Sequence, residues 1–159
     1  MQRKRVTRMW MAAMIVCGSL ALGASMAQAN GHCSDRTIDG DYGFSAEGVL
    51  LVLLPAPGVT LQFRSTGVAH FDGKGNVTWV EHTVINGQSL QPGFIAASGT
   101  YTVNPDCTGT AMVNTPNSPV PLNLHLTVVR DGTEVHTILD TDAISSVFIK
   151  VTSPQEDND

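Results

Sequence analysis

Hydrophobic and polar residues alternate along short runs of the chain from residue 41 onward, and Gly, Pro, Asn and Asp separate the runs. Alternation with a period of two predicts β-strands that bury one face. The connections are short enough for antiparallel neighbours. We therefore expect an all-β fold, an antiparallel up-and-down barrel of about eight strands. The expected strands lie near 41–48, 59–71, 77–85, 97–104, 109–114, 121–130, 133–140 and 144–152.

One hairpin can be predicted residue by residue from its turn. Asp131-Gly132 supplies the two left-handed positions of a type I′ turn, which places Arg130 opposite Thr133. One face of the hairpin is then apolar and the other mostly polar, as expected of a barrel wall packed on one side. Continuing this register pairs three residues of each strand, Leu124, Leu126 and Val128 with Leu139, Thr137 and Val135.

The segment 49–54, Val-Leu-Leu-Val-Leu-Leu, departs from the alternation because it is apolar at both parities. A barrel covers only the inner face of its strands, so something else must bury the second face. Three interpretations stay open. The loop that contains Pro55, Pro57 and Gly58 folds back over the segment, or the segment is the interface of a homo-oligomer, or it forms an apolar lip at a barrel mouth.

The beginning of the chain predicts export. Basic residues at 3, 4, 5 and 8 precede an apolar stretch from residue 9 to about 24, and Ala27-Gln28-Ala29 offers the small residues of a cleavage site. We expect residues 1–29 to be a signal peptide and the protein to be periplasmic or extracellular, with no integral membrane span. Residues 30–152 then form one β-barrel domain, and the acidic residues 153–159 form a disordered tail.

Charge excludes two classes of partner. Beyond residue 29 the chain has five basic and fourteen acidic residues, a net charge of −9. Scattered basic residues cannot form the continuous positive surface that nucleic-acid binding needs, nor dock the protein on anionic lipid. We therefore expect neither partner. The five are Arg36, Arg64, Lys74, Arg130 and Lys150.

Two cysteines, Cys33 and Cys107, lie beyond the expected signal peptide. An even pair in an exported chain predicts a disulfide, which would tie the start of the domain to a turn near its middle. The competing interpretation is a reactive thiol, which would need an activating base nearby and an unpaired state. We favour the structural disulfide.

Three motifs carry a family resemblance: Gly40-Asp41-Tyr42-Gly43-Phe44, Phe71-Asp72-Gly73-Lys74-Gly75-Asn76-Val77, and Gly99-Thr100-Tyr101-Thr102-Val103-Asn104-Pro105-Asp106-Cys107-Thr108-Gly109-Thr110. With this spacing the chain resembles bacterial exported proteins of the allene oxide cyclase barrel-like family over residues 33–150. The resemblance implies an eight-stranded barrel like those of allene oxide cyclases, dirigent proteins and lipocalins, often trimeric, with apolar ligands inside. No catalytic residue of the plant cyclases matches a position here, so none is assigned.

The titratable residues give no catalytic constellation. No HxH, HExxH or cysteine cluster accompanies the histidines, and we expect no metal and no cofactor. Glu47 and Glu81 lie within strands; Glu81 shares the parity of Trp79, but a solvated outer position is our prediction for both. Turn aspartates such as Asp72 and Asp106 should bond local backbone. The histidines are His32, His70, His82, His125 and His136, of which only His125 and His136 share a predicted strand face, with Asp140.

Four aromatic residues, Tyr42, Phe44, Trp79 and Tyr101, are the candidate ligand-binding residues, although filling the barrel is the simpler use for them. We favour a non-enzymatic exported barrel that binds a small hydrophobic ligand. The alternatives are an isomerase or cyclase acting on a hydrophobic substrate and a structural or assembly subunit. A polar group inside an open cavity would favour the enzyme, a dry open cavity the binding protein, and a filled barrel the structural subunit.

Overall fold

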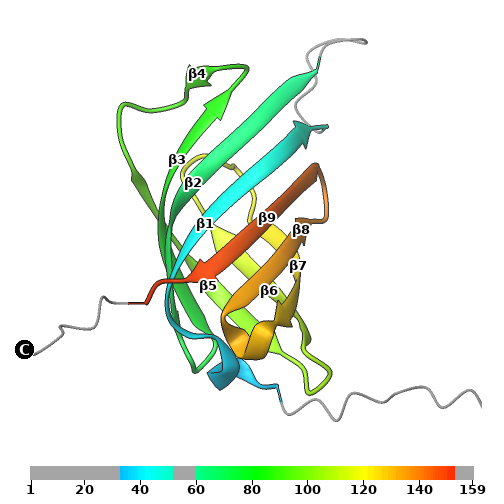
Figure 1. Ribbon diagram of the computed structural model, residues 1–159. Helices are drawn as coiled ribbons and strands as arrows, with labels where there is room; N and C mark the ends of the chain where they lie inside the picture. The colour runs from blue at the N-terminus through cyan, green and yellow to red at the C-terminus, as the bar shows by residue number, and fades with distance from the viewer. Residues whose placement is uncertain (1–32, 52–59, 153–159) are drawn as a thin grey trace, which may run out of the picture.

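The computed structural model of the protein describes residues 33–51 and 60–152 (Figure 1). The alternating segments of these residues form strands. A short 3₁₀ helix, η1 (Asp35–Ile38), precedes the first strand, and a second, η2 (Arg130–Gly132), lies between two later strands. The strands are β1 (Asp39–Leu50), β2 (Leu61–Asp72), β3 (Asn76–Ile85), β4 (Gln88–Ser89), β5 (Ile95–Val103), β6 (Thr108–Asn114), β7 (Leu122–Val129), β8 (Glu134–Leu139) and β9 (Ala143–Lys150).

Eight of these strands close into an antiparallel barrel. Each pairs with the next long strand along the chain, and β9 returns to pair with β1. The two-residue strand β4 only extends the edge of β3. The predicted all-β up-and-down barrel is therefore confirmed, and β4 is the one strand among the described residues that the sequence pattern did not predict.

The hairpin between β7 and β8 has the predicted register. Leu124 faces Leu139, and the pairing continues to the last pair before the turn. Asp131 and Gly132 both have positive φ, and the Thr133 N–H donates to the Arg130 carbonyl over 3.1 Å, as a type I′ turn requires. Arg130 also has a positive φ, of 51°, which the turn type did not predict.

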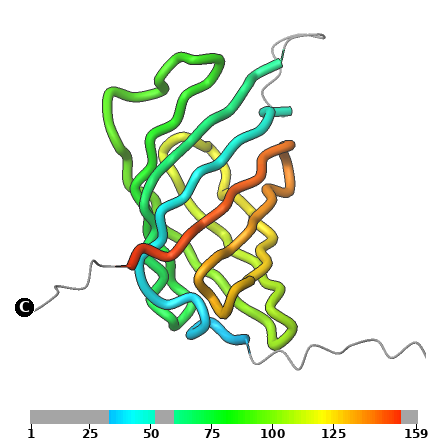
Figure 2. The backbone as a smooth tube through the Cα atoms, viewed as in Figure 1, coloured from blue at the N-terminus to red at the C-terminus, as the bar shows by residue number. Residues whose placement is uncertain are grey.

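One end of the barrel, hereafter the closed end, carries η1 and η2 (Figures 1 and 2). The Cys33–Cys107 disulfide joins the start of the described chain to the β5–β6 turn at this end, with 5.1 Å between the Cα atoms, so the predicted pairing is confirmed. Asp35 adds a second attachment, because its carboxylate accepts from the Val103 N–H over 2.7 Å. The side chain of Ile38 then plugs the end, fully buried.

Some sequence predictions fall on residues outside the described ranges: the signal peptide 1–29, the first residues of the domain 30–32, and the tail 153–159. The apolar segment is only partly described. Leu50 ends β1 with its side chain buried, Leu51 is 50% exposed, and 52–54 lie outside the described residues, so the homo-oligomer interface stays a prediction. Among the described residues, no helix has the length and hydrophobicity to cross a membrane.

Candidate functional site

The end of the barrel opposite η1, hereafter the mouth, contains an interior cavity of about 200 Å³. It lies between the ends of β1, β3 and β8 and the beginnings of β2, β7 and β9. The β6–β7 connection, residues 115–121, contributes six of the residues that line it, Thr115, Asn117, Ser118, Pro119, Val120 and Pro121. We take this cavity as the candidate functional site, because an enclosed, mostly apolar space with a few polar groups is the usual form of a small-molecule site.

A row of small side chains accounts for the empty space. Ala46 of β1 lies between Ser146 of β9 and Ser65 of β2. Ser65 in turn faces Thr83 of β3. One row nearer the mouth, Gly48 has no side chain at all. Because none of these residues reaches the barrel axis, four adjacent strands leave the interior unfilled at this level.

Aromatic rings form the floor of the cavity. The Phe44 ring stacks on Phe148 at 4.9 Å between centroids and contacts Trp79 at 5.7 Å. Gly67, opposite Phe44 on β2, makes room for this arrangement, since a Cβ there would lie 2.8 Å from the Phe44 ring. The floor therefore presents three aromatic side chains toward the mouth.

Glu81 lies inside the barrel, on the cavity wall, and is 6% exposed. The prediction of a solvated outer position was wrong for this residue and correct for Glu47, which is exposed. Two hydroxyls explain how the interior accepts a carboxyl group: Thr115 donates to Oε1 over 2.8 Å, and Ser65 donates to Oε2 over 3.4 Å. Its shared parity with Trp79 was the signal in the sequence, and the general preference of charge for solvent outweighed it.

The polar residues around Glu81 form a small network. The Thr83 hydroxyl donates to Ser65 Oγ over 3.1 Å, and the Ser65 hydroxyl also lies 3.2 Å from the carbonyl oxygen of His82. A second carboxylate, Asp142, lines the cavity at the mouth, where it accepts from the Leu51 N–H over 2.6 Å. Among the described residues no basic side chain forms an ion pair with Glu81.

The structure divides the four aromatic candidates into two groups. Phe44 and Trp79 line the cavity, and the Trp79 indole N–H has no hydrogen-bond acceptor among the described residues. Tyr42 and Tyr101 lie at the closed end, where their hydroxyls donate to the carbonyl oxygens of Gly132 and Asp35. Burial raises the pKa of each tyrosine to about 12. Both tyrosines therefore contribute to closing the barrel and do not border the cavity.

The four described histidines are not grouped. His70, His125 and His136 each contact one carboxylate, at 2.7, 2.9 and 2.7 Å. His82 bonds the Gly93 carbonyl oxygen and Ser89 instead. Within 33–51 and 60–152, no group of three or more His, Cys, Asp or Glu side chains could hold a metal ion. The shared strand face of His125 and His136 thus does not assemble a metal site in these residues.

Two of the turn aspartates bond local backbone as predicted. Asp72 accepts from the N–H groups of Lys74 and Asn76 over 2.7 and 2.9 Å. The side-chain hydrogen bond from Asn76, with these backbone bonds, lowers the pKa of Asp72 to about 2. Asp106 accepts from Thr108 in the turn that carries the disulfide, and the hydrogen bond from the Thr108 side chain lowers its pKa as well. These carboxylates shape turns far from the cavity.

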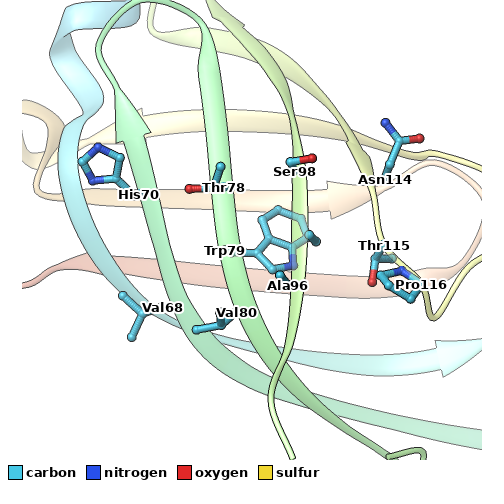
Figure 3. A pocket seen from close by; sticks show the side chains of 11 residues that line it. Val68, His70, Thr78, Trp79, Val80, Ala96, Ser98, Asn114, Thr115 and Pro116 are labelled. Atoms are coloured by element: carbon cyan, nitrogen blue, oxygen red, sulfur yellow. The ribbon is translucent and has the colours of Figure 1, made fainter.

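A wider hollow of about 670 Å³ lies on the outer wall over β2, β3 and β5 (Figure 3). It forms where β5 is paired on one side only. Residues 95–97 of β5 pair with β3, whereas the pairing of β5 with β6 begins at Ser98 and Asn114. Trp79 and Thr115 border both the hollow and the cavity and so separate them. Most of the other side chains of the hollow are exposed and none is a buried acid, so we place the candidate site in the interior cavity.

A scan against protein-family models and a search of the curated proteins both gave no match to this chain. The resemblance to allene oxide cyclase-like barrels therefore stays a prediction that rests on the three motifs. The barrel itself is established by the strand pairing alone. Because a scaffold does not determine function, the functional argument depends on the cavity.

Proposed function

We propose that the protein binds a small, largely hydrophobic molecule in the cavity at the mouth of the barrel. The observation that carries the proposal is the row of small residues, which keeps space open above an aromatic floor where larger side chains would fill it. Natural cores are packed densely, so a cavity of about 200 Å³ needs an explanation, and occupation by a ligand supplies one. An apolar cavity of about 150 Å³ is large enough for benzene.

Export is part of the same proposal. The predicted signal peptide and the Cys33–Cys107 disulfide both suit an oxidising compartment outside the cytoplasm. A ligand carrier there would meet molecules that enter from the surroundings. The periplasm and the external medium are equally compatible with this role.

Native mass spectrometry of the protein purified from its own periplasm or culture fluid tests the proposal. We expect a bound small molecule in stoichiometric amount, released by denaturing extraction. The variant Ala46→Phe should lose it, because the new ring extends from the centre of the small row into the cavity. The control is Ala96→Phe, the same substitution on the exposed side of the wall, in the outer hollow.

The two variants also show whether the passenger is bound in the interior cavity or in the outer hollow. Retention of the passenger by folded Ala46→Phe together with its loss from Ala96→Phe would move the site to the outer hollow. A wild-type protein that carries no passenger and takes up no hydrophobic probe would reject the binding function. An oligomeric mass in that case would favour the assembly subunit with 49–54 as its contact.

A second candidate function, an isomerase or cyclase, is favoured by one observation: Glu81 is a polar group inside the cavity. A carboxyl group held by Thr115 and Ser65 could exchange a proton with a substrate fixed above the aromatic floor. The variant Glu81→Gln separates the two functions. If the protein is an enzyme, molecules extracted from this variant and from the wild type should be isomers with different chromatographic retention; identical molecules support simple binding.

A further inference from the structure

We propose that the cavity selects organic cations, small molecules that join an apolar body to a protonated amine. This inference rests on the proposed binding function and names the class of ligand. It follows from where the charged side chains lie on the barrel, and from what surrounds Glu81.

Among the described residues, positive charge is concentrated at the closed end, away from the cavity. Arg36 lies in η1, Lys74 in the β2–β3 turn, Arg130 in η2, and Lys150 at the end of β9, all at the closed end. Arg64 is nearer the mouth but lies exposed on the outer wall, paired with Glu47 over 3.5 Å. The undescribed residues 52–59 contain no basic side chain.

The lining of the cavity has the opposite charge. Its two ionisable side chains among the described residues are both acidic, Glu81 on the wall and Asp142 at the mouth. A buried charge is stable when it is paired or fully hydrogen-bonded. The described residues give Glu81 only hydroxyl donors, one of them at a long 3.4 Å. A ligand ammonium group would supply the missing positive partner.

The aromatic floor favours the same ligand. Trp79 precedes Glu81 by two residues on β3, so both side chains point inward from neighbouring positions. Phe44 lies against Trp79 and opposite Gly67, which is itself the partner of Glu81 in the strand register. An ammonium group near Glu81 can therefore lie over aromatic faces, whose negative quadrupole attracts cations. A neutral or anionic head group gains neither an ion pair with Glu81 nor a cation–π contact, even where it accepts from the Trp79 N–H, which has no other acceptor among the described residues.

Four probes of nearly equal size test the selectivity: benzylammonium, benzyl alcohol, benzoate and toluene. Their affinities are measured by isothermal titration calorimetry on the protein lacking residues 1–29, freed of any passenger. We expect benzylammonium to bind about tenfold more tightly than benzyl alcohol, because only the ammonium group brings a positive charge that pairs with the carboxylate and is attracted by the aromatic faces. Benzoate should bind most weakly.

Glu81→Gln keeps the size and hydrogen-bonding shape of the side chain and removes its charge. It should abolish the preference for benzylammonium over benzyl alcohol, and toluene binding, which needs no charge, reports whether the cavity itself is intact. Glu47→Gln is the matched control, since it makes the same change in net charge on the outer wall and should keep the preference. Asp142→Asn at the mouth should reduce the preference less than Glu81→Gln.

The outcomes separate the ligand class from the binding function. Equal or weaker binding of benzylammonium, with toluene and benzyl alcohol still bound, would overturn cation selectivity and leave the binding function standing. Persistence of the preference in Glu81→Gln would also overturn the inference. Failure of all four probes to bind the wild type would reject both proposals. The wild-type comparison decides the question even if a variant does not fold.

Discussion

Reduction of the Cys33–Cys107 disulfide should lower the free energy of unfolding by about 4.5 kcal/mol. The two cysteines are 74 residues apart in the sequence. In the loop-entropy argument, a cross-link that closes a loop of this length removes about 15 cal/mol/K of entropy from the unfolded chain, which gives that free energy at 25 °C. In the unfolded state this one bond therefore restricts a loop that contains more than half of the described residues.

The folded state should survive the reduction. The start of the chain keeps two other attachments to β5, since the Tyr101 hydroxyl donates to the Asp35 carbonyl oxygen over 2.9 Å and the Val103 N–H donates to its carboxylate over 2.7 Å. The effect should then appear in the unfolded state. A reduced unfolded chain is more expanded, so the dependence of the unfolding free energy on denaturant should become steeper.

Guanidinium unfolding with and without dithiothreitol measures the difference, and fluorescence of the buried Trp79 reports it. The control is the double variant Cys33→Ala, Cys107→Gly, whose stability should not respond to dithiothreitol. Glycine suits position 107, where φ is 67°. A loss below about 1 kcal/mol with an unchanged denaturant slope would refute the argument that the bond acts by constraining the unfolded chain.

Gly67→Ala should cost about 1–3 kcal/mol, since its Cβ would lie 1.9 Å from a backbone oxygen of β3, whereas Gly43→Ala, with nothing within 4 Å, should be nearly neutral in the same denaturation assay. Tyr42 and Tyr101 should ionise near pH 12 in an ultraviolet titration and near 10 once unfolded, so stability present below pH 10 is lost as the pH rises toward 12; native titration at 10 would contradict this. Leu51→Asp should lower the mass seen by light scattering if 49–54 joins subunits, and an unchanged mass in a folded variant removes that interface.

The strands and one complete register were predictable because they depend on local chemistry. Alternation gave the inward and outward faces, and Asp131-Gly132 fixed the β7–β8 pairing through its turn type. The departure of β5 from β6 was not predicted. Asn86-Gly87 forms a two-residue turn that joins β3 to β4, but residues 90–94 after β4, with Pro92 and Gly93, show no alternation that would place the start of β5. The position of each aromatic side chain along the barrel axis was also not predicted. Parity places Tyr42 and Tyr101 inside the barrel, but the plug at their end depends on the docking of η1.

The prediction for Glu81 was wrong because two rules of sequence interpretation disagreed at this position, the alternation of strand residues and the preference of charge for solvent. The alternation was correct. Parity placed it inside, and charge placed it outside. In the sequence Ser65 and Thr83 look like ordinary strand residues, and Thr115 follows a predicted strand. Only the closed barrel brings the hydroxyls of Ser65 and Thr115 to the Glu81 carboxyl group, with the Thr83 hydroxyl donating to Ser65.

A void and a buried acid are each unfavourable for a barrel that only has to fold. Here they adjoin: the row through Ala46 and Ser65 that leaves the space empty lies next to the row that holds Glu81. Larger apolar side chains at these positions would fill the core at no cost to the strand pattern. The two unfavourable features lie together at the mouth, the end of the barrel that η1 does not plug. This is the arrangement expected where a sequence keeps space for a ligand at the expense of core packing.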